Sequence, residues 1–157
     1  MTRLLFVCLG NIIRSPLAEN LFRFQAEQAG VIDKYLVDSA GTADYHVGNP
    51  PDSRMQRTAE LHGVNDGGTA RQIQESDFDE FDWIVAMDRQ NRRDLQQIAG
   101  TPEKQAKIRL MRDFDPEPDD PDVPDPYYGG ADGFENTYQI VERSVHGLLE
   151  ALEASDI

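Results

Sequence analysis

The sequence is short of cysteine, of basic residues and of long apolar runs. Its 157 residues include a single cysteine, Cys8, so an intramolecular disulfide is impossible and a zinc site built from several cysteines is excluded. No run is long and apolar enough to span a bilayer, and the first strand-like run, Leu4 to Val7, is too short for the apolar region of a signal peptide. We therefore expect a cytoplasmic protein with no membrane partner.

Basic side chains are outnumbered throughout the chain. Lys and Arg number 15 against 29 Asp and Glu, which gives a formal charge of −14. Residues 113–157 alone hold 13 acidic residues and one arginine, Arg143. Nucleic acid is a poor partner for such a surface, because a phosphate backbone requires a basic footprint. We interpret the acidity as a contribution to solubility, and hold as a sharper hypothesis that it selects substrates with basic flanks.

The sequence as a whole has the composition of an ordinary globular domain, with 39% apolar and 28% charged residues. The length fits one domain with one core and the chain has no internal repeat, so we expect residues 1–157 to form a single domain. Short apolar runs typical of buried strands alternate with patterns of helical spacing. We expect strands at 4–7, 35–37, 83–87 and 106–111. We expect helices from Ser15 to Gly30, from Pro51 to Leu61, after Asp88 with Asp88 as its N-cap, and from Phe134 to Leu152.

This alternation predicts an α/β fold: a four-stranded, mostly parallel sheet flanked by helices on both faces. Ligands bind such sheets beyond the carboxyl ends of the strands, where the direction of winding changes. The turn after the first predicted strand is one such place.

The turn after the first strand predicts a phosphate-binding loop. Cys8 ends the strand, five residues separate it from Arg14, and Ser15 and Pro16 are suited to the N-cap and first position of a helix. The N–H groups of a tight loop before a helix N-terminus form a nest for an anion, and Arg14 adds a planar fork for two phosphate oxygens. The same positive surroundings favour a thiolate at Cys8, to which Ser15 can donate a hydrogen bond. The predicted loop consists of Leu9, Gly10, Asn11, Ile12, Ile13, Arg14 and Ser15.

A second candidate region is the segment 113–130, which contains five prolines and seven acidic residues. Long ordered loops are often functional. If the substrate is a phosphate ester with a poor leaving group, a positioned acid should protonate the departing oxygen. The pattern leaves several carboxylates open for this role. Asp125 stands out because Pro124 and Pro126 restrict it.

The segment Cys8 to Pro16, Cys-Leu-Gly-Asn-Ile-Ile-Arg-Ser-Pro, resembles the signature of the low-molecular-weight protein-tyrosine phosphatases. One position departs from the signature, since Ile13 replaces the family's second cysteine. An oxidised Cys8 therefore has no resolving partner in the chain. The resemblance covers essentially the whole sequence, with further shared segments at 38–42, 45–48, 51–54, 70–73, 81–88 and 125–130.

The resemblance implies a phosphotyrosine hydrolase that works through a phosphocysteine on Cys8, with Arg14 holding the phosphate and Asp125 as general acid and then base. It implies no cofactor, and we expect no metal site because no histidine has ligand spacing. The implied partners are phosphotyrosine-bearing proteins or peptides, tyrosine kinases among them, with phosphate as product. The implied pocket walls are Tyr45, Tyr127 and Ile12, and the implied supporting residues are Asn11, Ser15 and Ser39.

Several side chains near these segments have a plainer interpretation. Tyr128 fits surface packing, and His46 and His62 fit surface or turn positions. Some relatives carry a histidine just before the segment 70–73, where this chain has Gly68, so the network that supports the loop must end differently.

Three other functions stay open from the sequence. An arsenate reductase shares this fold in some bacteria, but it needs further cysteines that this chain lacks. A catalytically inactive phosphotyrosine-binding module would not need Cys8, Arg14 and Asp125 together. An acidic interaction domain that uses residues 113–125 would not need the nucleophile loop.

Overall fold

Four parallel strands form the centre of the protein in a computed structural model that describes residues 1–157. The order β2-β1-β3-β4 means that the chain adds β2 on one side of β1 and then returns to the other side for β3. The carboxyl ends of β1 and β3 therefore flank the point at which the winding reverses, where such sheets bind ligands. The strands are β1 (Thr2–Cys8), β2 (Tyr35–Gly41), β3 (Trp83–Ala86) and β4 (Ile108–Leu110).

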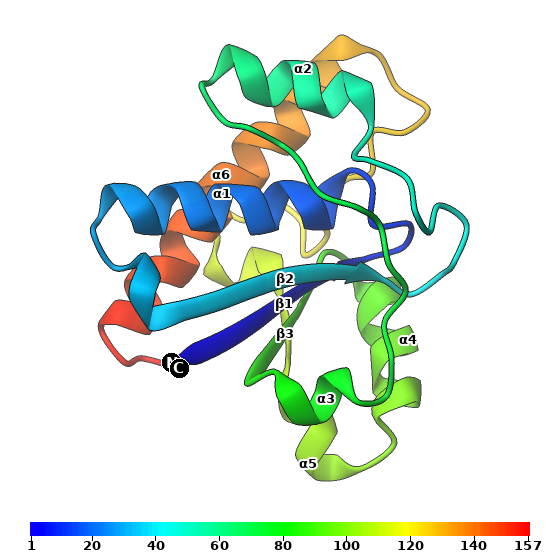
Figure 1. Cartoon of the computed structure of the whole chain (residues 1–157), viewed down its shortest axis with the longest axis vertical. Helices are drawn as coiled ribbons and strands as arrows, with labels where there is room; N and C mark the ends of the chain where they lie inside the picture. The colour runs from blue at the N-terminus through cyan, green and yellow to red at the C-terminus, as the bar shows by residue number, and fades with distance from the viewer.

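Helices cover both faces of this sheet, which confirms the predicted α/β architecture (Figure 1). One face packs against α1 and α6, with α2 packed against α6, and the other packs against α3 and α4. The helices are α1 (Arg14–Gln28), α2 (Ser53–Leu61), α3 (Asp77–Glu80), α4 (Arg89–Ala99), α5 (Pro102–Gln105) and α6 (Ala131–Glu153), with short 3-10 turns η1 (Ile32–Lys34) and η2 (Met111–Phe114).

β1 is buried on both faces because its residues alternate between two cores. Leu4, Phe6 and Cys8 belong to the core shared with α1 and α6, whereas Leu5 and Val7 belong to the core shared with α3 and α4. This alternation follows from the two-residue period of a strand. It places Cys8 at the end of the strand, on the face that α1 covers.

The first helix does not begin as predicted. It starts at Arg14 with Ile13 at the N-cap and no side-chain cap, so the prediction of Ser15 as N-cap is wrong. Ser15 lies inside the first turn, where its hydroxyl oxygen is 3.0 Å from Cys8 Sγ. The end of the helix agrees with the prediction, since Gly30 adopts a left-handed φ of 72° just beyond it.

Other boundaries differ for local reasons. The second helix starts at Ser53, not Pro51, because Asp52 caps it by accepting a hydrogen bond from the Arg54 N–H. The predicted strand 106–111 is limited to Ile108–Leu110, since Ala106 ends α5 and Met111 begins η2. The predicted strand 83–87 ends at Ala86. The sequence did not predict α3 or α5, which at four residues each are too short to show a helical period.

α6 packs very closely against η2 at Gly147. A Cβ atom added there would lie 1.9 Å from the Phe114 carbonyl oxygen, a distance that no side chain can occupy. Glycine weakens a helix interior by about 0.5–1 kcal/mol relative to alanine. Its presence in the middle of α6 is therefore explained by the close approach of η2, which begins the acidic segment.

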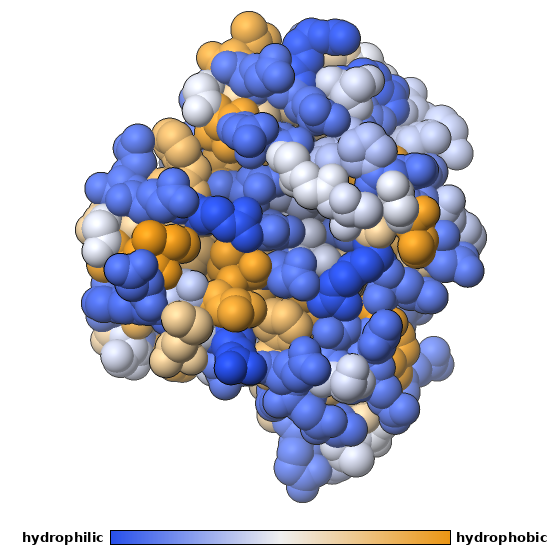
Figure 2. Space-filling model, in the orientation of Figure 1, coloured by the Kyte–Doolittle hydropathy of each residue, from blue (hydrophilic) through white to orange (hydrophobic).

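The surface is mostly polar. Figure 2 shows one face on which apolar side chains emerge only in separate groups among hydrophilic ones. None of the helices combines the length and the apolarity that a bilayer crossing requires.

One carboxyl group is buried without full compensation beside α1. Asp66 is 2% exposed; its Oδ1 accepts a hydrogen bond from Asn20 Nδ2, and its Oδ2 has no partner. Burial, with a smaller contribution from nearby Glu19, raises the pKa of Asp66 to about 6. The folded state therefore binds this proton more tightly than the unfolded chain, and stability falls as pH rises from about 4 to about 6.

We accordingly expect Asp66→Asn to stabilise the protein at pH 7.5 by roughly 2 kcal/mol, with little gain at pH 4. Asparagine keeps the acceptor for Asn20 and removes the buried charge. Urea unfolding at both pH values measures the difference, with exposed Asp33→Asn as control. An equal effect of Asp66→Asn at the two pH values would contradict the assignment.

Candidate active site

A pocket of about 220 Å³ opens at the carboxyl end of β1. It brings together three distant parts of the chain: the loop after β1, the turn around Tyr45, and the end of the acidic segment. Its lining includes the predicted nucleophile, arginine and acid together with all three predicted wall residues. The lining residues are Cys8, Leu9, Gly10, Ile12, Ile13, Arg14, Tyr45, His46, Asp125, Tyr127 and Tyr128.

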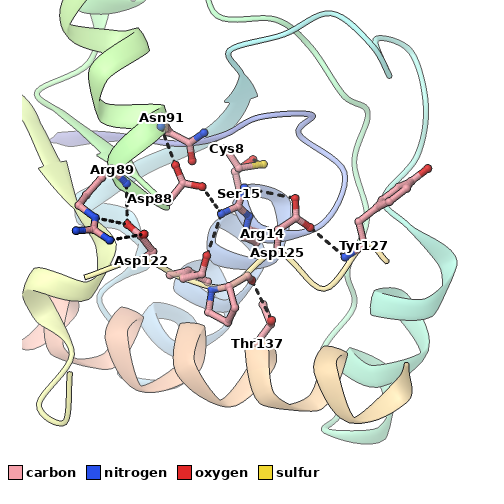
Figure 3. A network of polar contacts seen from close by, with 12 residues as sticks. Cys8, Arg14, Ser15, Asp88, Arg89, Asn91, Asp122, Asp125, Tyr127 and Thr137 are labelled. Carbon is pink, nitrogen blue, oxygen red and sulfur yellow. Dashed lines mark hydrogen bonds and ion pairs between the residues drawn. The ribbon is translucent and has the colours of Figure 1, made fainter. Parts of the chain in front are cut away.

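Cys8 is buried and receives hydrogen bonds at sulfur. Its Sγ accepts from the Asn11 N–H at 3.3 Å. It also lies 3.0 Å from the Oγ of Ser15, which can donate its hydroxyl proton; Figure 3 labels Cys8 and Ser15. Hydrogen bonds to the charged form of an acid favour that form. The local geometry therefore suits a sulfur that carries negative charge.

The loop after Cys8 is rich in N–H groups without an internal acceptor. Apart from Asn11, each residue from Leu9 to Ser15 has a backbone N–H that donates no hydrogen bond within the chain. Arg14 and Ser15 belong to the first turn of α1, where a helix has no internal acceptor and carries partial positive charge. These six donors lie in a loop that lines the pocket, which is the arrangement of an anion nest. They belong to Leu9, Gly10, Ile12, Ile13, Arg14 and Ser15.

Asn11 holds this loop in an unusual backbone conformation. Its φ of 55° lies in the left-handed region, which asparagine tolerates better than most residues. Its Nδ2 donates to Ser15 Oγ and Ser39 Oγ at 2.9 and 3.0 Å, and its Oδ1 accepts from the Arg71 N–H at 3.0 Å. The three residues predicted to support the loop, Asn11, Ser15 and Ser39, are thus one hydrogen-bonded group.

The supporting network ends on a carboxylate. Ser39 Oγ donates to Glu19 Oε1 at 2.6 Å, and Glu19 in turn pairs with Arg23. Gly68 borders a small polar cavity of about 130 Å³ beside Glu19 and Ser39. With glycine at residue 68, the network therefore continues to Glu19, a residue that no sequence pattern singled out.

Arg14 has one edge anchored and one edge free. Its Nη1 donates to Asp88 Oδ2 at 2.7 Å and to the Val123 carbonyl at 2.9 Å. Its Nε and Nη2 donate no hydrogen bond within the chain, and Nη2 has only an ion pair with Asp125 at 3.6 Å. Burial alone would lower the pKa of Arg14, but negative charge at Cys8, Asp88 and Asp125 outweighs burial and raises it. The guanidinium is therefore a fixed cation with a free edge for two phosphate oxygens.

Asp88 has a second role beyond the predicted helix cap. Its Oδ1 accepts from the Asn91 N–H at 2.7 Å, which caps α4 as expected, and its Oδ2 holds Arg14. Its place just after β3, the neighbour of β1 in the sheet, brings it beside Arg14.

Asp125 is the carboxylate of the acidic segment that lines the pocket. Its Oδ1 accepts from the Tyr127 N–H at 3.1 Å, and its Oδ2 lies 3.6 Å from Arg14 Nη2. The neighbouring carboxylates are engaged elsewhere: Arg112 lowers the pKa of Asp119, and Arg89 lowers the pKa of Asp122. The structure thus places Asp125, which its flanking prolines single out, in the pocket, and pairs Asp119 and Asp122 with arginines.

The rim of the pocket is aromatic. Tyr45 is 71% exposed, whereas Tyr127 is partly buried with the Arg54 guanidinium 5.4 Å from its ring centre. Two further residues also line this rim and agree with their surface or turn interpretation: Tyr128 is 96% exposed, and His46 lies in the turn 45–48. Tyr128 packs edge-on against Tyr127, and His46 lies so close to Gly10 that a Cβ there would be 2.9 Å from its ring.

Comparisons with known proteins agree with this geometry. The family model described as low molecular weight phosphotyrosine protein phosphatase matches residues 3–156. The chain belongs to this family. A low molecular weight protein-tyrosine-phosphatase of Streptomyces coelicolor is 45% identical over 152 residues, which cover 96% of this chain and 93% of the relative.

Solved structures place the fold in the same family of phosphatases. A crystal structure of a protein tyrosine phosphatase from Entamoeba histolytica, with Hepes in its active site, is 39% identical, covers 100% of both chains and has a TM-score of 0.96. A Drosophila arginine phosphatase is 33% identical, covers 98% of both chains and has a TM-score of 0.90. The predicted family and its phosphotyrosine phosphatase activity are thus confirmed, and the low molecular weight phosphatases act on phosphotyrosine substrates and release phosphate.

Proposed function

We propose that this phosphatase uses Cys8 as nucleophile, Arg14 and the loop N–H groups as phosphate ligands, and Asp125 as general acid and base. The observation that supports these roles is the single pocket that unites the three side chains with six N–H donors free of internal acceptors.

In the first step, the Cys8 sulfur attacks phosphorus in line with the departing phenol. The S–P bond forms as the P–O bond to the tyrosine ring breaks, and Asp125 transfers a proton to the phenolic oxygen. The free edge of Arg14 and the loop N–H groups hold the remaining phosphate oxygens as charge spreads over them.

In the second step, water attacks the phosphocysteine. Asp125, now a carboxylate, accepts a proton from the water as the new P–O bond forms and the S–P bond breaks. The sulfur leaves as an anion, and the hydrogen bonds from Ser15 and from the Asn11 N–H stabilise it. Phosphate is released and no cofactor takes part.

We further propose that tyrosine is the preferred phosphoamino acid. Because an arginine phosphatase shares the fold, the fold alone does not select the substrate. The selection comes from the lining: Tyr45 and Tyr127 offer flat walls to a phenyl ring, and Ile12 keeps the floor apolar. We propose phosphotyrosine proteins of the cytoplasm as partners, tyrosine kinases among them.

The role of Asp125 is tested by Asp125→Asn. We expect kcat/KM to fall by about 100- to 10,000-fold on a phosphotyrosine peptide, since the phenol then leaves unprotonated. Asparagine keeps the acceptor for the Tyr127 N–H, so the loop should stay in place. Dinitrophenyl phosphate, whose leaving group needs no proton, should lose far less.

Asp120→Asn is the matched control. Asp120 lies in the same segment and accepts from the Asp122 N–H, which asparagine can also do. If both variants lose activity equally, or if Asp125→Asn slows both substrates alike, Asp125 is not the general acid.

A further inference from the structure

The segment before Asp125 is held by its backbone at three consecutive residues. The carbonyl oxygens of residues 122–124 each accept a hydrogen bond from a side chain, and each donor comes from a different element of the fold. The donors are, in order, Arg112 Nη1 of η2 at 2.9 Å, Arg14 Nη1 of α1 at 2.9 Å, and Thr137 Oγ1 of α6 at 3.1 Å.

Val123 fixes the centre of this segment. Its N–H donates to the Met87 carbonyl at 2.8 Å, and its side chain is 1% exposed within the α1 and α6 core. The segment therefore docks against the end of β3 by both its backbone and its one apolar side chain.

Arg112 is buried where it binds the segment before Asp125. It is 3% exposed, and besides the Asp122 carbonyl it binds the Asp119 carboxylate. Its charge is balanced underneath by Asp115, whose Oδ2 is 3.0 Å from Arg112 Nε. Burying a guanidinium is unfavourable unless it is paired, and Arg112 is paired with two points of the acidic segment, the Asp122 carbonyl and the Asp119 carboxylate.

Thr137 is fully buried on α6, and its hydroxyl leaves its own helix to reach the Pro124 carbonyl (Figure 3). A buried hydroxyl on a helix commonly bonds its own backbone four residues back, as Ser144 does with the Ile140 carbonyl. The Pro124 carbonyl belongs to the peptide unit that carries the Asp125 N–H. Thr137 therefore holds the peptide unit that directly precedes Asp125.

Few contacts hold the Asp125 side chain itself in place. Its exposed fraction is 44%, and its contacts are the Tyr127 N–H and Arg14 at 3.6 Å. A general acid must lie within hydrogen-bond reach of the leaving oxygen, and a displacement of about 1 Å can cost on the order of 100-fold in rate.

We propose that Arg112 and Thr137 are positioning residues that clamp the carbonyls of Asp122 and Pro124 and so hold Asp125 at the leaving group. The inference rests on the proposed role of Asp125. The clamp acts on the protonation of the leaving group and not on the attack by Cys8, because neither residue lines the pocket.

The test is the dependence of kcat/KM on the leaving group. For Thr137→Val, which keeps the shape and removes the hydroxyl, we expect a loss of about 10- to 100-fold on phenyl phosphate. Dinitrophenyl phosphate should change by less than about 3-fold, because its departure needs no proton. Arg112→Gln should show the same selectivity, and Thr137→Ser, which restores a hydroxyl, should recover the loss on phenyl phosphate.

Two matched controls separate positioning from general stability. Ser144→Ala removes a buried hydroxyl from the same helix, and Arg143→Gln removes the other arginine that binds Asp115 without touching the clamped segment. Thermal unfolding of every variant accompanies the kinetics. Both controls should lower stability and leave the ratio of the two rates unchanged.

The outcomes are distinguishable. If Asp125→Asn shows leaving-group selectivity and Thr137→Val and Arg112→Gln do not, the clamp is refuted while the proposed function stands. If Asp125→Asn itself shows no selectivity, the proposed function fails first. Selectivity in Ser144→Ala or Arg143→Gln equal to that in Thr137→Val would also overturn the clamp.

Discussion

Cys8→Ser should reduce turnover of phosphotyrosine by a factor on the order of 10⁵ or more, a loss typical of removing an activated nucleophile. A serine hydroxyl at this site is a much weaker nucleophile, because the surroundings stabilise a sulfur anion and because Asp125, which acts as the acid in the first step, cannot deprotonate an alcohol in that step. Steady-state phosphate release from a phosphotyrosine peptide measures the loss.

The same variant should still bind the anion. Serine fits the buried volume of Cys8 and keeps an acceptor for the Asn11 N–H, so the loop should retain its conformation. Phosphate binding to Cys8→Ser by calorimetry, within a few-fold of wild type, is the control. Residual turnover near the wild-type rate would show that the sulfur is not the nucleophile.

Arg14→Lys should lower kcat/KM by a factor on the order of 10³, although the charge is kept. The guanidinium binds Asp88 and Val123 with one edge and leaves the other edge free, whereas a single ammonium cannot do both. The same steady-state assay measures the loss.

Arg14→Lys should also cost about 1–3 kcal/mol of stability, because the Val123 carbonyl loses its buried donor. Arg93→Lys, on the exposed side of α4, is the control and should change neither quantity. If lysine at residue 14 preserved wild-type kcat/KM, phosphate binding through a fixed planar fork would be refuted.

The parts of the site that are local in sequence could be predicted from it. Cys8, the loop and Arg14 lie within seven residues, and a buried strand before them and a helix after them set their geometry. The apolar run of β1 likewise predicted a strand buried on both faces, because no polar residue interrupts it.

The predictions that failed concern contacts between residues that are far apart in the sequence. Arg14 meets Asp88 across 74 positions and the Val123 carbonyl across 109, and no sequence pattern marks such partners. The Ser-Pro pair predicts a helix cap at Ser15 because this pair is a common helix start, but the Ser15 hydroxyl instead lies 3.0 Å from Cys8 Sγ and accepts a hydrogen bond from Asn11 Nδ2. Here tertiary hydrogen bonds outweighed a local capping preference.

The ranking of the acidic residues shows the same limit. Asp119, Asp122 and Asp125 are identical residues in the same proline-rich acidic segment. In the folded chain, Arg112 lies beside Asp119, Arg89 lies beside Asp122, and Asp125 lines the pocket. Family resemblance selected Asp125 where the pattern could not.

Detection of the phosphoryl enzyme is the most direct test of Cys8 as the nucleophile. A rapid denaturing quench during turnover of phenyl phosphate, followed by peptide mass spectrometry, should find a phosphoryl group on the peptide that contains Cys8, bound to sulfur, and none in Cys8→Ser. Turnover with no phosphorylated Cys8 at any quench time, or a phosphoryl group on another residue, would contradict it.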